Sequence, residues 1–339
     1  MSKKVINVGI IGSGRMGKGH AENLSVLPEV HLTAVSDINY SAAEELASKH
    51  GIKACKDEQT ILKDSDVDAV IIATPTPFHS GTAIIAAKNG KSIFCEKPLA
   101  MTIEEGLAIK KAVEDNEVTF GIGFTKRYSW PETRIKELLP LLGEAKAGRV
   151  TNIFAQFSRH KGDWFTDFKR SGGYTIDSMV HFFDAVRWFF GEAKTVSGKG
   201  LLMSSDIPEP MDYTFANIEF TSGMVASLDG GWIRRGVSIC SSYYLIGTEG
   251  TIYYDGKEDL LKVFVGNDYF EESREKDGAD PMYLEIETFI RCLINQKPFS
   301  PSVNDGIEAL RMALGIVESI KTGKTVRLET KCSEMGSVV

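Results

Sequence analysis

Residues 8–20, VGIIGSGRMGKGH, decide how the first part of the chain folds. A short apolar run, which predicts a buried strand, leads into Gly12, Gly14 and Gly17 in the spacing GxGxxG, and a helical pattern follows. Glycines at this spacing let the backbone approach a pyrophosphate, and the amides at the start of the helix attract its negative charge. The loop, with Arg15 and Met16 inside it, therefore predicts a dinucleotide-binding site.

Asp37 supports this interpretation, because it ends the next predicted strand, about twenty residues after Gly17. A carboxylate there accepts hydrogen bonds from the adenosine ribose hydroxyls and repels a 2′-phosphate, so NAD is favoured over NADP as the cofactor. The alternative is a glycine-rich turn beside an unrelated surface aspartate. The strand before the loop and the helix after it favour the dinucleotide site.

Strand and helix patterns alternate through the first third of the chain. The strand patterns are near-continuous and rich in β-branched residues, as in strands buried on both faces of a parallel sheet. They occupy residues 5–11, 31–37, 67–74, 91–97 and 118–124. The alternation predicts an α/β fold class, with an N-terminal Rossmann domain, a doubly wound parallel sheet, over residues 1–124.

The pattern changes after residue 124. Aromatic-rich strand patterns joined by short turns predict a C-terminal α+β domain with a mostly antiparallel open sheet over residues 125–330. Residues 331–339 are expected to form a flexible tail. The strand patterns occupy residues 151–160, 213–220, 224–232, 241–247 and 251–255, and the helix patterns occupy residues 175–190, 281–296 and 304–322.

The composition argues against several classes of protein. The 339 residues carry a formal net charge of −7, which gives no support to nucleic-acid binding. No apolar run approaches the length that spans a bilayer, and five scattered cysteines without a CxxC pair point to reduced thiols in the cytoplasm. The histidines and acidic residues lack the spacing of metal ligands, so no metal is expected.

Charged residues follow one of the predicted parallel strands, where Glu96 and Lys97 precede Pro98. Ligands bind at the carboxyl ends of strands in open parallel sheets, and the proline restricts Lys97 to an extended backbone. The alternative is a solvated charge pair at the start of a loop. The loop after the preceding strand, ATPTPFH at residues 73–79, ends in His79, a position more typical of a packing or capping residue than of a catalyst.

The stretch GGYTIDSMVHFFDAVRWFF, residues 172–190, predicts a buried amphipathic helix that contains two titratable residues. Asp177 and His181 are spaced so that both side chains project from one face of a helix. Such a pair is either a structural ion pair or acid–base machinery. Three other histidines have no chemical neighbours in the sequence and are interpreted as incidental: His20, His31 and His50.

These motifs together resemble the Gfo/Idh/MocA oxidoreductase family, whose members include inositol 2-dehydrogenase. The resemblance covers nearly the whole chain and is carried by GSGRMG at 12–17, ATPTPFH, CEKPLA at 95–100, GFTKRY at 123–128 and GGYTIDSMVH at 172–181. It implies a catalytic group of Lys97, Asp177 and His181. The cofactor contacts that it and the glycine loop imply are Gly12, Gly14, Arg15, Met16, Gly17, Asp37, Thr74, Pro75, His79, Glu96 and Lys97.

The resemblance also implies a role for each catalytic residue. His181 would act as general base on the substrate hydroxyl, since the pKa of histidine suits that task near neutral pH. Asp177 would bind a neighbouring hydroxyl and raise the basicity of His181, and Lys97 would stabilise developing negative charge on the reacting oxygen. Glu96 would lie near the nicotinamide ribose. The alternative is a buried Asp–His pair that holds helix to sheet.

The expected reaction is hydride transfer between NAD and a hydroxyl of a ring polyol or sugar, with an inositol favoured. The alternatives are another aldose, an amino sugar or a sugar acid. An NAD-dependent glycosidase is less favoured, because its characteristic sequence is missing. An NAD-sensing regulator is also less favoured, because such relatives tend to lose the catalytic triplet, which this chain has. The candidate substrate contacts are Arg127, His160, Asp163 and Trp164, of which Trp164 either stacks on a sugar ring or is an ordinary half-buried tryptophan.

A homo-oligomer, a dimer or tetramer with the tetramer favoured, is expected mainly from the resemblance, because the second-domain sheets of the family pack face to face. The strand patterns of that domain are rich in Tyr, Phe, Leu and Ile. This composition fits a sheet with one face under helices and the other under a partner subunit.

Overall fold

The structure is a computed structural model that describes residues 5–155, 166–203, 212–233, 236, 238–274 and 278–328. Its contacts divide the chain into unit 1, residues 1–130 with 277–310, and unit 2, residues 131–276 with 311–339. The domain limits expected from the sequence, 1–124 and 125–330, and the flexible tail stay predictions. His160, Asp163 and Trp164 lie outside the described residues.

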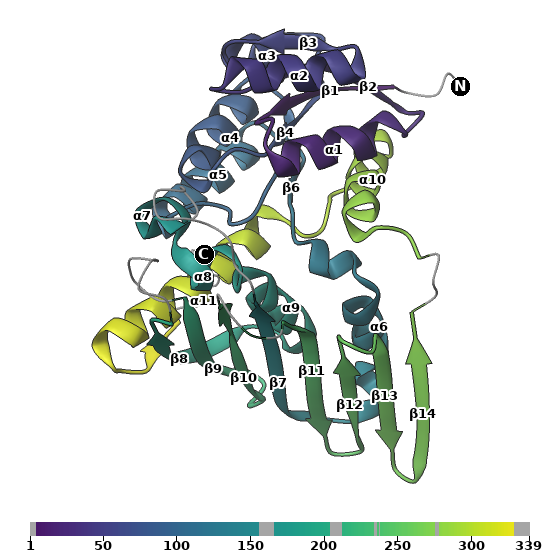
Figure 1. The fold of residues 1–339 in the computed structure, drawn as a ribbon, viewed down its shortest axis with the longest axis vertical. Helices are drawn as coiled ribbons and strands as arrows, with labels where there is room; N and C mark the ends of the chain where they lie inside the picture. Colours follow the sequence, from purple (N-terminus) through teal and green to yellow (C-terminus); the bar gives the residue numbers. More distant parts are fainter. Residues whose placement is uncertain are drawn as a thin grey trace, which may run out of the picture. The chain divides into compact units, whose positions relative to one another are not determined.

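Unit 1 contains a six-stranded parallel sheet in the order β3-β2-β1-β4-β5-β6 (Figure 1). The predicted doubly wound sheet is therefore confirmed. The sequence did not reveal β3, because a strand of 3 residues is too short to show a pattern. The strands are β1 (Ile6–Ile11), β2 (Val30–Ser36), β3 (Lys53–Cys55), β4 (Ala69–Ile72), β5 (Ser92–Cys95) and β6 (Phe120–Ile122).

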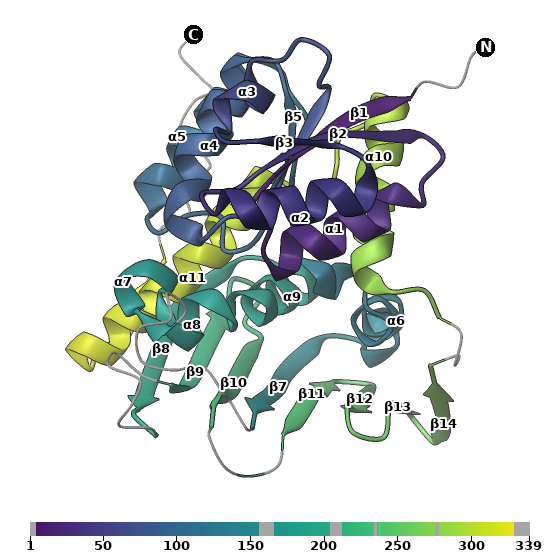
Figure 2. The ribbon, with the colours of Figure 1, turned by 45° about the horizontal axis from the view of Figure 1, so that its top comes forward.

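Helices cover both faces of this sheet, which is why β4 is buried along its whole length. The strand order reverses between β1 and β4, so right-handed crossovers place the helices that follow β1 and β2 on one face and those that follow β4 and β5 on the other. Helix α1 contacts α2, and α4 contacts α5 (Figure 2). The helices are α1 (Arg15–Ser25), α2 (Tyr40–His50), α3 (Gln59–Leu62), α4 (His79–Lys88) and α5 (Ile103–Asp115), with 3₁₀ turns η1 (Thr76–Phe78) and η2 (Thr125–Tyr128).

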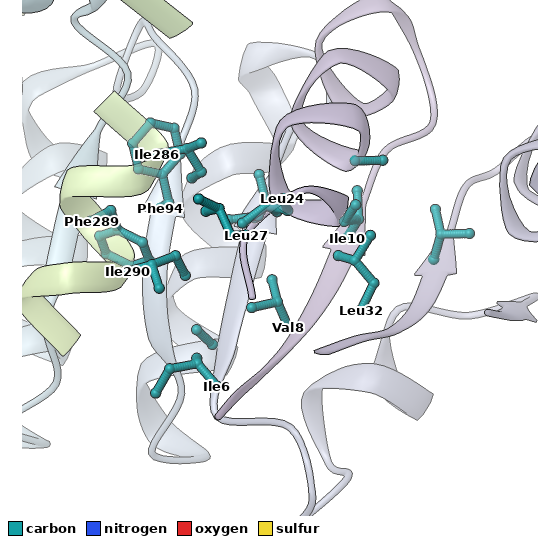
Figure 3. Packing of buried hydrophobic residues seen from close by; sticks show 14 of the residues in the cluster. Ile6, Val8, Ile10, Leu24, Leu27, Leu32, Phe94, Ile286, Phe289 and Ile290 are labelled. Atoms are coloured by element: carbon teal, nitrogen blue, oxygen red, sulfur yellow. The ribbon is translucent and has the colours of Figure 1, made fainter. Parts of the chain in front are cut away.

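Helix α10 (Pro281–Ile294) comes late in the sequence but completes the core of unit 1. Its side chains Ile286, Phe289 and Ile290 belong to one buried cluster with Phe94 of β5. Phe289 meets the Phe94 ring edge-on at 5.5 Å, and Figure 3 shows the three side chains together with Phe94 in the cluster. The Rossmann sheet thus depends for part of its apolar cover on a helix that comes after β14 of the second sheet in the chain.

Unit 2 contains a nine-stranded sheet in the order β14-β13-β12-β11-β7-β10-β9-β8-β15 (Figure 1). Only the β7–β10 pair is parallel among the described pairings, so the predicted mostly antiparallel sheet is confirmed. The strands are β7 (Ala145–Phe154), β8 (Ala193–Leu201), β9 (Tyr213–Phe220), β10 (Val225–Trp232), β11 (Ile239–Gly247), β12 (Gly250–Asp255), β13 (Leu260–Val265), β14 (Asp268–Ser273) and β15 (Val326–Arg327).

The predicted single helix over residues 175–190 is wrong in one respect, because the structure has two helices there, α8 (Gly173–Asp177) and α9 (Val180–Phe190). The amides of Ser178 and Met179 both donate to the carbonyl of Tyr174, which leaves an extra residue at the junction. Asp177 therefore ends one helix and His181 lies in the first turn of the next. The other described helices are α6 (Trp130–Leu138), α7 (Phe168–Ser171) and α11 (Val303–Thr322), and η3 (Leu139–Leu142) is a 3₁₀ turn.

Helices α8 and α9 lie on one face of the unit 2 sheet. The ring of Tyr174 meets Trp232 edge-on at 5.6 Å, and Phe190 meets Phe220 in the same way at 5.7 Å. Side chains alternate along a strand, so the opposite face, which we call the open face, carries a different set of residues. It exposes the apolar side chains Phe215, Val225, Tyr244, Ile246, Phe264 and Tyr269.

No helix within the described ranges is long and apolar enough to cross a membrane.

Candidate cofactor and active site

The three glycines of the loop between β1 and α1 meet three different spatial demands. Gly12 has a φ of +102°, and a Cβ there would lie 2.5 Å from the carbonyl oxygen of Ala73. A Cβ on Gly17 would collide with the carbonyl oxygen of Gly12, so this glycine lets α1 pack close to the loop. Nothing lies within 4 Å of the equivalent point on Gly14. The loop thus turns tightly at its ends and is open at its middle glycine, where a pyrophosphate would approach.

The start of α1 is suited to an anion. Its N-cap is Gly14, no side chain caps its amides, and no acidic residue lies in its first turn. The amides of that turn therefore keep their capacity to donate, and the positive end of the helix dipole faces the same space. Arg15 is exposed and Met16 partly buried beside it. These residues fit the diphosphate of a dinucleotide.

Asp37 lies directly after β2, and its carboxylate is bonded to the glycine loop. The Ser13 amide and hydroxyl donate to Oδ2 at 2.7 and 2.9 Å. The amide of Asn39 donates to Oδ1 at 2.8 Å. The carboxylate is therefore held beside the loop, which is where the expected contact with the adenosine ribose requires it.

The loop after β4 is joined to the loop after β5 by His79. The Nδ1 atom of its ring lies 2.8 Å from the carbonyl oxygen of Pro98, and Nε2 lies 2.8 Å from that of Thr74. Burial lowers the pKa of His79, and its two carbonyl partners offset this in part. The packing role expected for His79 agrees with these contacts. Its contact with the cofactor, like those of Thr74 and Pro75, stays a prediction.

His20 is not incidental, and the interpretation from sequence was wrong for this residue. Its Nε2 lies 2.7 Å from Oε1 of Glu96, and both side chains are buried. Burial by itself raises the pKa of Glu96, but the hydrogen bond from His20 and the nearby positive charges bring that pKa below its usual range. The sequence did contain a signal: the buried face of α1 is Gly17, His20, Ala21 and Leu24. A histidine on such a face needs a polar partner.

Lys97 follows Glu96 and is half-buried, at the carboxyl end of β5. The Lys97–Pro98 peptide bond is cis. Because β5 ends at Cys95, the side chain of Lys97 starts from the edge of the parallel sheet at which ligands bind in such folds.

Asp177 and His181 lie in unit 2, on the helical segments anchored to its sheet. Asp177 is 3% exposed and accepts a hydrogen bond from the Ser178 hydroxyl at 3.1 Å, and His181 is half-buried. Two contacts fix α8: the Tyr174 hydroxyl donates to the carbonyl of Asn152 at 2.9 Å, and the Thr175 and Thr214 hydroxyls lie 2.7 Å apart. The backbone that carries Asp177 is thereby held on the sheet.

Arg127, a predicted substrate contact, has protein partners within unit 1. Its guanidinium donates to Asp305 at 2.9 Å and to the Ser300 hydroxyl at 3.2 Å, and its side chain is 8% exposed. These contacts give Arg127 a structural role, and a contact with substrate stays a prediction. Within the part of the chain that the structure describes, no group of three or more His, Cys, Asp and Glu side chains could hold a metal ion.

Comparison with known proteins identifies relatives along nearly the full chain. Residues 6–124 match the model of the Gfo/Idh/MocA oxidoreductase family, NAD-binding Rossmann fold, and residues 135–253 match that of the GFO/IDH/MocA C-terminal domain. The scyllo-inositol 2-dehydrogenase (NAD(+)) of Bacillus subtilis (strain 168) is 30% identical, with 98% of each chain aligned. The myo-inositol 2-dehydrogenase of Thermotoga maritima is 29% identical, over 96% of this chain and 99% of the relative.

A solved structure is similar over the same extent. It is levoglucosan dehydrogenase in complex with NADH and levoglucosan, which is 26% identical with a TM-score of 0.85. The similarity covers 96% of this chain and 100% of that one.

Proposed function

Because the chain belongs to the Gfo/Idh/MocA oxidoreductase family, we propose that it is an NAD-dependent dehydrogenase that acts on a hydroxyl of a ring polyol, with an inositol as the favoured substrate. The full-length similarity to two inositol 2-dehydrogenases is the observation that carries this proposal. An aldose or anhydro sugar is the second candidate, favoured by the similarity to levoglucosan dehydrogenase.

NAD is proposed in preference to NADP because of Asp37. Its carboxylate is held beside the glycine loop by Ser13 and Asn39. The negative charge of the carboxylate would repel the 2′-phosphate of NADP, and its oxygens would accept a hydrogen bond from the 2′-hydroxyl of NAD. The uncapped start of α1 and the open space at Gly14 would take the diphosphate. Bound NAD supplies the hydride acceptor for the oxidation.

Three residues are proposed to act on the substrate. His181 removes the proton of the reacting hydroxyl, Asp177 binds the neighbouring hydroxyl and supports the basicity of His181, and Lys97 donates a hydrogen bond to the reacting oxygen. The anchoring of α8 supports this assignment for Asp177, because a catalytic group has to be held by its surroundings. Arg127, His160, Asp163 and Trp164 stay proposed substrate contacts.

A homo-oligomer that covers the open face is proposed as well. Exposed aromatic and aliphatic side chains such as Phe215, Tyr244 and Phe264 lie on it, whereas the other face is under helices. An apolar surface of this kind is typical of contact with another subunit. Sedimentation of the wild type and of Phe264→Glu would test it: the proposal expects a dimer or tetramer that the charge weakens.

The function is tested by the absorbance of NADH with the purified protein, NAD and a panel of inositols, aldoses, anhydro sugars and sugar acids. The expected result is turnover with one polyol, lost in His181→Ala and kept in His31→Ala. His31 is an exposed histidine whose ring contacts Asn7, so it controls for the loss of an imidazole as such. Tight NAD binding without turnover on any member of the panel would refute the proposal.

A further inference from the structure

A buried cluster of three titratable residues lies in unit 1, and none of its members acts on the substrate in the proposed reaction. Its members are His20 on α1, Glu96 after β5 and Glu285 on α10. They come from distant parts of the sequence, and each is at most 5% exposed. Burying charged groups in this way is costly unless they are paired, so the contacts between them need an explanation.

His20 and Glu96 make the central contact, at 2.7 Å between Nε2 and Oε1. The ring of His20 is held edge-on against Phe94, with 5.3 Å between ring centroids. The carboxylate of Glu96 lies over Gly123, where an added Cβ would come within 3.2 Å of Oε2. Among the described residues His20 is thus the side chain that bonds the Glu96 carboxylate, and the missing side chain of Gly123 leaves room for that carboxylate.

Glu285 is the third member of the cluster. Its Oε1 accepts a hydrogen bond from the Thr125 hydroxyl at 3.0 Å, while Oε2 is buried without a partner among the described residues. Burial raises the pKa of Glu285 well above its usual range, and the negative charge of Glu96 raises it further. The raised pKa favours the neutral acid at Glu285, and the lowered pKa of Glu96 favours the carboxylate that His20 contacts.

We propose that His20 is a positioning residue of the cofactor site, which holds the Glu96 carboxylate in place for the nicotinamide ribose. The inference rests on the proposed function and on the contact between Glu96 and that ribose that the family resemblance implies. His20 lies on the same helix whose N-terminus is suited to the diphosphate, six residues after Gly14 in the sequence. One helix would therefore serve both halves of the dinucleotide, through its amides at one end and through an imidazole in its middle.

The test compares NAD binding, by calorimetry, in His20→Gln and His20→Asn. The side-chain amide of glutamine reaches the position of the imidazole Nε2, whereas that of asparagine is one methylene shorter. We expect His20→Gln to bind NAD within about threefold of the wild type. We expect His20→Asn to bind about tenfold more weakly, which corresponds to losing one hydrogen bond to a charged group. The KM for NAD should rise in His20→Asn with little change in kcat.

Several outcomes would overturn the inference. Equal NAD affinity in both variants and the wild type would mean that His20 holds only the core together, even if both variants melt at a lower temperature. A fall in kcat with an unchanged KM for NAD would also overturn it. Failure of the proposed reaction can be distinguished from failure of this inference. If the wild type binds NAD but oxidises no polyol, the substrate assignment is wrong, and the binding data on the His20 variants still test the inference. A wild type that binds no NAD overturns both.

His31→Asn is the matched control for the loss of an imidazole, since His31 is exposed on β2 in the same unit. It should bind NAD as the wild type does. A weakening equal to that of His20→Asn would point to a general loss of stability in unit 1 and would overturn the specific role of His20.

Discussion

Ser13 donates two hydrogen bonds to the same oxygen of Asp37, one from its amide at 2.7 Å and one from its hydroxyl at 2.9 Å. The second carboxylate oxygen accepts one described hydrogen bond, from the amide of Asn39, and so keeps the capacity to accept another. The carboxylate is oriented before a ligand binds. Such preorganisation lowers the cost of binding.

Asp37→Ser should weaken discrimination between the two nicotinamide cofactors. Removing the carboxylate removes both an acceptor for ribose hydroxyls and the charge that repels a 2′-phosphate. We expect the ratio of kcat/KM for NAD to that for NADP to fall by about tenfold or more, the size of one hydrogen bond involving a charged group.

The measurement is initial rates with both cofactors, and Asp115→Ser is its control. Asp115 is an exposed aspartate that pairs with Lys111 on α5, so its loss changes the net charge equally. An unchanged ratio in Asp37→Ser would rule out Asp37 as the selecting residue.

Gly230→Ala should destabilise unit 2 and lower kcat. A Cβ at this position would collide with the carbonyl oxygen of Asn152 and with the hydroxyl of Tyr174, which anchors α8. Overpacking of this kind costs about 1–3 kcal/mol. The shift should reach Asp177 at the end of α8, so the loss of kcat should exceed the change in substrate KM.

Urea unfolding and steady-state kinetics check the effect of Gly230→Ala. Gly81→Ala serves as the comparison, because a Cβ on Gly81 in α4 has nothing within 4 Å. That change should stabilise the protein by about 0.5–1 kcal/mol. If both variants gave the same stability, the packing of Tyr174 against β10 would be in doubt.

Glu285→Gln should stabilise the protein at pH 8 more than at pH 4.5. Burial raises the pKa of Glu285 in the folded state above its unfolded value of 4.5. A raised carboxyl pKa contributes stability below the unfolded value, and this contribution is lost as the pH rises toward the folded value. Glutamine does not titrate, so the variant should escape that loss.

Unfolding free energies of the wild type and Glu285→Gln at a series of pH values test this sign. The matched variant is Glu114→Gln, because Glu114 is an exposed glutamate on α5. The difference in unfolding free energy between Glu114→Gln and the wild type should vary little over the same pH range. A stabilisation by Glu285→Gln that is greatest in acid would contradict the assignment.

Arg127→Ala and Asp305→Ala should both destabilise unit 1, by about 3 kcal/mol, since each leaves a largely buried charge without its partner. The two changes separate the structural role of Arg127 from the predicted contact with substrate. If Arg127 also binds substrate, only its loss should raise the substrate KM. Thermal unfolding measures the stability of both variants, and steady-state kinetics measure their substrate KM. Unchanged stability in Arg127→Ala would show that the ion pair has no structural role.

Some features of the site follow from local patterns and others do not. The glycine spacing and Asp37 lie on one strand–helix–strand segment, so a sequence pattern suffices to predict that they converge. His20 was misjudged because its partner, Glu96, is 76 residues away in the chain. Likewise Arg127 pairs with Asp305 at a separation of 178 residues, and the sequence around either residue does not predict the pairing.

The junction between α8 and α9 shows a different kind of failure. The apolar periodicity of residues 172–190 is helical throughout, and it does not reveal that the hydrogen-bond pattern slips at Ser178 and Met179. Propensity differs little between a continuous helix and two short ones, so packing decides between them. Here Tyr174 lies over Gly230 and the Phe190 ring meets Phe220. The break between α8 and α9 lies between these two contacts and allows both helices to pack on the sheet.

By itself, then, the sequence determined the two kinds of sheet, the doubly wound parallel type of the first and the glycine loop, because these depend on periodicity and on glycines at set positions. Only the tertiary structure decided that α10 completes the core of unit 1, that Glu96 is held by His20, and that Arg127 pairs with Asp305. The physical reason is that a buried polar group must find its partner among whatever side chains packing brings near, and packing joins segments without regard to their distance along the chain.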